Sequence, residues 1–143
     1  MDSRRVLLTC ICISMMILPS SPCLPWQRQK RRMGELSSAV TKLTANVEST
    51  VRYANIPTNI SESELLDRST EHDPQILKFF SKYSIHIIHN DRDAVILVCT
   101  KDEKRALFED AGCTAELDEI LWTNKPPRRC AFGTTVEAAC PKK

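Results

Sequence analysis

Cysteine is the residue type in this 143-residue chain whose chemistry the sequence predicts most directly. Seven cysteines are present, and three of them lie within the first 23 residues. If that segment is removed during export, an even set of four is left, as expected for two disulfides in an oxidising compartment. The four lack the Cys-x-x-Cys spacing that is typical of zinc and redox sites. We therefore predict two disulfides, and no metal or cofactor, for the remaining set: Cys99, Cys113, Cys130 and Cys140.

The partners of these cysteines follow in part from the hairpin that contains two of them. A polar turn at 101–104 places Thr100 opposite Arg105. In that register Cys113 lies about seven residues, or roughly 23 Å, along from Cys99, whereas a disulfide needs α-carbons within about 7 Å of each other. Both cysteines should therefore bond to the C-terminal segment. Two pairings satisfy this condition: the nested one, Cys99–Cys140 with Cys113–Cys130, and the crossed one, Cys99–Cys130 with Cys113–Cys140.

Acid–base chemistry has weaker support in the sequence. His86 and His89 are three residues apart on a predicted strand, so they project to opposite faces and cannot share a metal ion. Either histidine, together with the adjacent acids Glu109 and Asp110, would supply the base and the acid of a small secreted enzyme or toxin. The chain has only three glycines and no phosphate-binding loop, and no serine lies in a nucleophile-elbow pattern. We therefore expect a non-catalytic protein and keep the enzyme as the alternative.

The N-terminus has the form of a secretory signal peptide, which we assign to residues 1–23. Two arginines precede an apolar run of thirteen residues, Val6–Leu18, and small residues come after it. A run of this length is well below the ~20 residues needed to span a bilayer. We predict that the signal is cleaved and that the mature chain is secreted or periplasmic. The alternatives are a lipoprotein acylated at Cys23 and an uncleaved membrane anchor.

Charge is unevenly distributed, although the formal net charge is only +2. Residues 61–120 carry fourteen acids against seven bases, while 24–60 and 121–143 each sum to +4. We expect the densest basic run, Arg28–Arg32, to be a solvated linker; a proprotein-convertase site and contact with an anionic membrane are the alternatives. Two tryptophans in an ordinary globular composition argue against an aromatic-rich nucleic-acid binder.

From Met33 to Ala54 apolar residues recur every three or four positions, which predicts an amphipathic helix with one apolar stripe. Such a stripe either packs on the sheet of its own domain or forms a seam with another protein or another copy of the chain. Asn55, Pro57 and Asn59 separate this helix from the next predicted one. We therefore predict that residues 24–60, basic linker and helix, form a loosely attached binding arm with these partner-binding residues: Leu36, Val40, Leu43, Val47 and Val51.

Residues 61–143 are predicted to form a disulfide-stabilised α+β domain. Ser61 opens a capping box that starts one short helix, and Asp73-Pro74 starts another. A three-stranded antiparallel meander comes next, over these ranges: Tyr83–His89, Ala94–Cys99 and Arg105–Glu109. In its middle strand the residues that point to either face of the sheet are apolar. We therefore expect the helices to cover one face, and the C-terminal segment or a partner to cover the other. After the meander we expect a short helix over Ala115–Trp122 and a final strand or loop over 131–139.

The function that these features favour is that of an exported accessory factor, a small disulfide-stabilised module. It would bind a protein partner or a second copy of itself through the 33–54 helix. We expect no nucleic acid and no small molecule, and membrane contact only through the N-terminal segment; a membrane-associated subunit of an envelope complex is a further alternative. Asn59-Ile60-Ser61 also fits the N-glycosylation sequon, which matters only if the chain passes through a eukaryotic secretory pathway.

Overall fold

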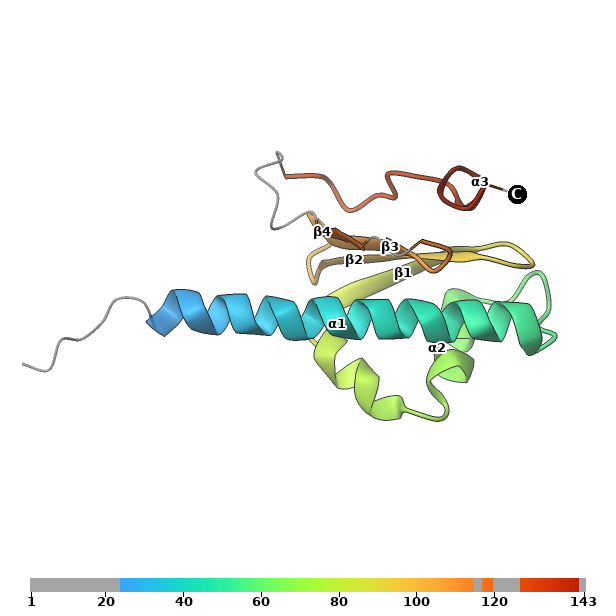
Figure 1. Ribbon diagram of the computed structural model, residues 1–143, viewed down its shortest axis with the longest axis horizontal. Coiled ribbons are helices and arrows are strands. Elements are labelled where there is room, and N and C mark those ends of the chain that lie inside the picture. Colours follow the sequence, from blue (N-terminus) through green and yellow to red (C-terminus); the bar gives the residue numbers. More distant parts are fainter. Residues whose placement is uncertain (1–23, 115–116, 120–126, 142–143) are drawn as a thin grey trace, which may run out of the picture.

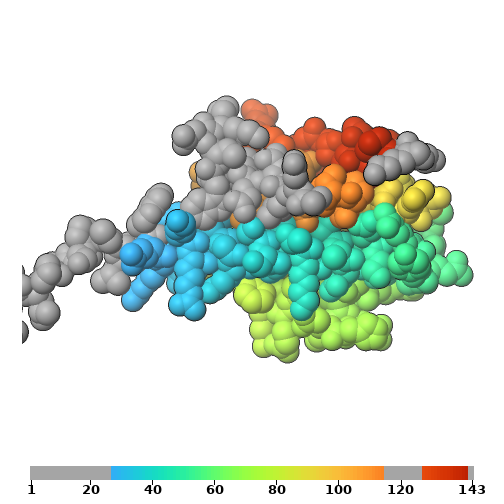
Figure 2. All heavy atoms as spheres, in the orientation of Figure 1, coloured from blue at the N-terminus to red at the C-terminus, as the bar shows by residue number. Residues whose placement is uncertain are grey.

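The computed structural model describes residues 24–114, 117–119 and 127–141. A four-stranded antiparallel sheet lies between the long helix α1 (Leu24–Tyr53) on one face and the C-terminal segment on the other (Figures 1 and 2). Two shorter helices, α2 (Glu62–Thr70) and η1 (Pro74–Phe80), pack against α1 and also contact the first strand of the sheet. The predicted α+β class is confirmed. The predicted signal peptide, residues 1–23, lies outside the described residues.

Helix α1 has thirty residues and begins well before the predicted start at Met33. The run Arg28–Arg32, predicted to be a linker, continues the helix, because glutamine, arginine and lysine are good helix formers and no glycine or proline interrupts them. Its side chains are exposed, and the first turns of α1 extend past the edge of the sheet in Figure 1. The helix ends before Asn55, whose φ of 47° is the left-handed conformation that commonly follows a helix.

The apolar stripe of α1 packs on the sheet of its own chain. Leu43, at the centre of the stripe, is 0% exposed, and it shares one core with Ile96 and Phe108 from the sheet. The five residues predicted to bind a partner are all core residues, so in this fold they are not available to another protein: Leu36, Val40, Leu43, Val47 and Val51. The physical reason is that the apolar sheet face needs a cover as much as the helix does. The predicted separation of 24–60 from 61–143 therefore cuts through a single core.

The two short helices pack on α1 through buried apolar residues, among them Leu65, Ile76 and Phe80. At the start of α2 the Ser61 hydroxyl accepts a hydrogen bond from the backbone N–H of Glu64 at 3.3 Å, as the capping box predicts. The second predicted helix is the 3-10 helix η1. Asp73 precedes it without a side-chain capping hydrogen bond.

The sheet has the strand order β1-β2-β3-β4, so the predicted meander is present and has a fourth strand beside it. The strands span Tyr83–His89, Ala94–Thr100, Ala106–Ala111 and Leu117–Glu119. Thr100 lies opposite Arg105 as predicted, with a backbone hydrogen bond of 2.9 Å. A bulge after Val98 then shifts the register by one, so that Val98 lies opposite Phe108. The predicted helix at 115–122 is wrong over Leu117–Glu119, which form strand β4. The other residues of that predicted helix lie outside the described ones.

Strand β2 is buried on both faces, as its uniformly apolar sequence predicts. Ile96 and Val98 belong to the core under α1, whereas Val95 and Leu97 contact the C-terminal segment. That segment crosses the sheet as an extended loop and ends in the short helix α3 (Val136–Ala139), not in a strand.

Candidate functional site

The two disulfides have the crossed pairing, Cys99–Cys130 and Cys113–Cys140, each with α-carbons 5.7 Å apart. Both join the sheet to the C-terminal segment, as predicted. The direction of that segment decides between the two alternatives: it passes over the end of β2 first, where Cys99 lies, and reaches the end of β3 last. The bridges close loops of 31 and 27 residues, so each contributes roughly 3.5 kcal/mol in the chain-entropy account.

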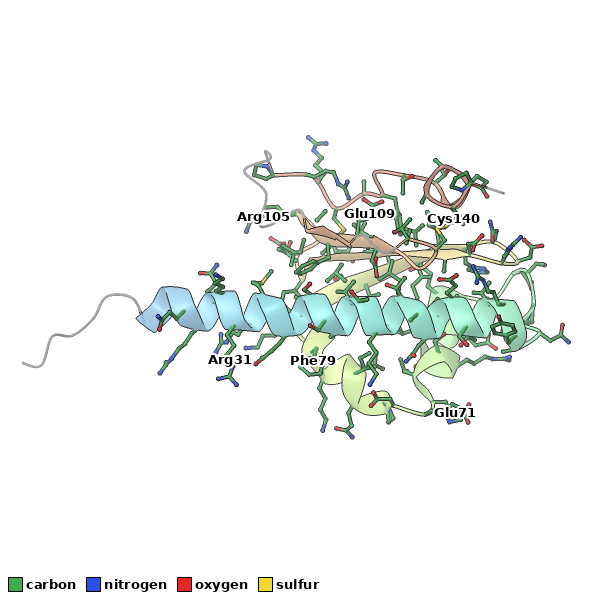
Figure 3. All side chains as sticks on the ribbon, in the orientation of Figure 1. Arg31, Glu71, Phe79, Arg105, Glu109 and Cys140 are labelled. Carbon is green, nitrogen blue, oxygen red and sulfur yellow. A yellow bond between two sulfur atoms is a disulfide. The ribbon has the colours of Figure 1, made fainter. Side chains whose placement is uncertain are left out.

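Glu109 holds the C-terminal segment on the sheet. Its carboxylate is buried and accepts hydrogen bonds from the backbone N–H groups of Gly133, at 2.9 Å, and Thr134, at 3.2 Å. It also pairs with the guanidinium of Arg128, and Figure 3 shows it between β3 and the crossing segment. A β-carbon on Gly133 would overlap the Arg128 side chain. With these three donors Glu109 is a structural anchor that joins β3 to the C-terminal segment.

The histidines and acids that the enzyme hypothesis needs are not gathered in one cleft. His86 lies in the same cross-strand row as Glu109, but Leu97 stands between them, and two strand spacings amount to about 9.6 Å. His89 is on the opposite face of β1, and its Nδ1 lies 3.1 Å from the carbonyl oxygen of Asn90. His86 and Glu109 are therefore not in direct contact across the sheet.

The His86 ring lies close to two carboxylates and to the sulfur atoms of one disulfide. Its ring nitrogens lie 3.8 Å from a Glu62 oxygen and 3.6 Å from a Glu103 oxygen. One ring nitrogen and the sulfurs of Cys99 and Cys130 lie within 4.8 Å of one another, the only such group of three potential metal ligands among the described residues. The two sulfurs are bonded to each other, so they cannot act as thiolate ligands while the disulfide is intact.

A buried carboxylate cluster between α1 and β3 is the feature that sequence reasoning missed. Glu48, Asp93 and Asp110 are 7%, 8% and 5% exposed, and Arg52 pairs with the first two. Burial raises the pKa of Asp110, and a hydrogen bond with the Thr44 side chain opposes that rise. Burial is also the main cause that raises the pKa of Glu48. The available signal was that Glu48 and Arg52 lie one helical turn apart beside the apolar stripe.

Residues of α1 and η1 line a mainly apolar groove with a volume of about 750 Å3. Phe79 lines it and is 49% exposed. Because a 3-10 helix has three residues per turn, Phe79 lies one turn along from the buried Ile76 and continues its apolar surface outward. Figure 3 shows Arg31 and Phe79 on the same side of α1.

The groove also has a polar rim. Lys42 on α1 donates to the carboxylate of Asp73, at the start of η1, over 2.6 Å. Nearer the N-terminus of α1, Arg31 donates to Glu35 over 3.0 Å. Both cations are therefore paired, and apolar contact is the main interaction that the groove floor offers.

Comparison with protein-family models, with curated proteins and with solved structures finds no match for this chain. The described helices include none that is both long and apolar enough to cross a membrane. The proposed function therefore rests on the geometry of the chain itself.

Proposed function

We propose that this chain is an exported, disulfide-stabilised interaction module, a secreted or periplasmic accessory factor that is not an enzyme and binds a protein partner through the groove between α1 and η1. The observation that carries the proposal is Phe79, a large apolar side chain about half exposed beside an apolar groove. Aromatic side chains in such positions are common anchors of protein interfaces. The α1 stripe that the sequence favoured for this role is in the core.

The chemistry of the groove selects a partner with an apolar segment flanked by acidic side chains. The apolar segment would cover Phe79 and Ile76. The acidic side chains would face the exposed basic run Arg28–Arg32, which continues along α1 from the groove. Exposed charges of this kind steer association and set orientation more than they add affinity. The association rate should therefore fall as the salt concentration rises, while the affinity changes little.

Export is supported by the four cysteines and by the signal-like N-terminus. Both disulfides join a sheet to a segment that has little core of its own, an arrangement typical of small domains that fold in an oxidising compartment. Mass spectrometry of the purified mature protein, with and without reductant, tests this part. We expect a new N-terminus near residue 24 and no free thiols on the four cysteines. Free thiols on all four, with an intact N-terminus, would refute export.

The binding surface is tested by photo-crosslinking. A photoreactive amino acid is placed at Phe79 in one protein and at Tyr53 in a control, because Tyr53 is an exposed aromatic residue that does not line this groove. We expect position 79 to give a defined crosslinked species in the exported fraction, and position 53 to give none. A crosslink between two copies of the chain would identify self-association as the interaction.

A point substitution then measures the contribution of the anchor. Phe79→Asp should weaken capture of the crosslinked partner at least tenfold, whereas Tyr53→Asp should not change it. Phe79 is half exposed, so its loss costs less than about 1.5 kcal/mol of folding free energy and both proteins should stay folded by circular dichroism. Equal capture by the two variants would show that the groove is not the interface.

A further inference from the structure

The loop between α1 and α2 is held at both of its ends and turned outward between them. Ile56 and Ile60 are partly buried against the main core. Between them the chain makes a turn, closed by a hydrogen bond of 3.2 Å from the Ile60 N–H to the carbonyl oxygen of Pro57. Thr58 and Asn59, in the turn, are exposed. The two isoleucines therefore anchor both ends of a turn in which Asn59 is exposed to solvent.

Asn59 begins the only Asn-x-Ser/Thr sequence in the chain, and the middle residue, Ile60, is not proline. Within the described part of the chain, no residue holds the Asn59 carboxamide by a hydrogen bond. Ser61, the hydroxyl residue of the sequence, is exposed at the N-terminus of α2. A bulky group on Asn59 would therefore replace no contact of the fold.

We propose that Asn59 is a site of N-linked glycosylation, an inference that rests on the proposed export of the chain. In the transfer step the carboxamide nitrogen of Asn59 forms a bond to C1 of the first sugar of a lipid-pyrophosphate-linked oligosaccharide. The bond from C1 to the pyrophosphate oxygen breaks, and the lipid pyrophosphate leaves. The nitrogen loses one proton to a base of the transferring enzyme, so no oxidant or reductant is needed.

The glycan leaves the proposed binding groove open. Lys42 is the residue of α1 nearest the loop that lines the groove, and the helix continues to Tyr53. Eleven residues at a rise of about 1.5 Å each place the end of the helix roughly 17 Å farther on. Figure 1 shows the α1–α2 loop at the end of α1 opposite its basic first turns. The sugar would therefore cover that end and leave the groove exposed.

The test is secretion of the full chain from cultured mammalian cells, in two forms. One form has its own N-terminus, and the other has a standard cleavable signal sequence placed before Met1, so that it enters the secretory pathway in any case. Each is treated with peptide N-glycosidase and analysed by gel mobility and by peptide mass spectrometry. We expect a single mobility shift that the enzyme removes, with conversion of Asn59 to aspartate.

Three variants identify the acceptor. The shift should be lost in Asn59→Gln and in Ser61→Ala, and kept in Ser61→Thr, which retains the hydroxyl. Ser61→Ala also removes the N-cap of α2, so Asn59→Gln is the decisive variant. Secreted protein from the form with the added signal that carries unmodified Asn59 would overturn the proposal. Glycan on that form alone would support the proposal while refuting export by the native N-terminus.

Discussion

The burial of Leu43 predicts how strongly the long helix is bound to the sheet. Leu43 is 0% exposed and contributes to the core formed by α1, β2 and β3. Leu43→Ala removes three carbon atoms from that core and leaves a cavity, because packed neighbours such as Phe108 relax only in part. If α1 were a detachable arm, the same change would leave the rest of the domain intact.

The expected loss is about 3–4 kcal/mol, since Leu→Ala changes at fully buried sites cost about 2–5 kcal/mol. For a mature chain of this size, each kcal/mol lowers the melting temperature by about 3–5 °C, so the shift should be about 9–20 °C. The matched control is Thr41→Ala, two residues away on the exposed face of α1. It should change the free energy of unfolding by less than about 0.5 kcal/mol.

The assay is unfolding in urea with the disulfides intact, monitored by circular dichroism. The transition midpoint of Leu43→Ala should fall while its slope stays that of the parent protein, because the same surface is exposed on unfolding. A chain that begins at Ser61 should fail to fold, since it would expose the sheet face that α1 covers. A Leu43→Ala midpoint equal to that of Thr41→Ala, or a stable domain starting at Ser61, would refute the assignment of α1 to the core.

Two further changes test the buried carboxylates. Asp110→Asn should raise stability at pH 7, because burial raises the pKa of Asp110 and its ionised form therefore opposes folding; below the unfolded pKa of about 3.9, where both states are protonated, the gain should vanish. Urea unfolding from pH 3 to 8 measures this, and a gain that does not depend on pH would contradict it. Glu109→Ala should cost about 2 kcal/mol by leaving Arg128 and two backbone donors without their acceptor. Hydrogen exchange at Gly133 and Thr134 should then accelerate, and unchanged protection there would show that Glu109 is not the anchor.

The sequence by itself determined the local elements of this protein. Alternating and uniformly apolar runs predicted the first three strands, and a stripe with a spacing of three and four predicted the helix through Leu43. The distance along the hairpin was enough to exclude a bridge between Cys99 and Cys113. These predictions succeed because they depend on periodicity and chain length, which are properties of neighbouring residues. The signal peptide and the export that it implies are still predictions.

Only the tertiary structure decided which surfaces meet. The stripe on α1 suits a sheet as well as a partner, and nothing in its spacing says which one covers it. The crossed disulfides result from the direction in which the C-terminal segment crosses the sheet, and β4 forms where local pattern predicted a helix because β3 offers it an unpaired edge. Asp110 is buried although carboxylates are usually exposed, and Phe79 is half exposed although large apolar side chains are usually buried. They depend on how separate elements pack, which no short stretch of sequence specifies.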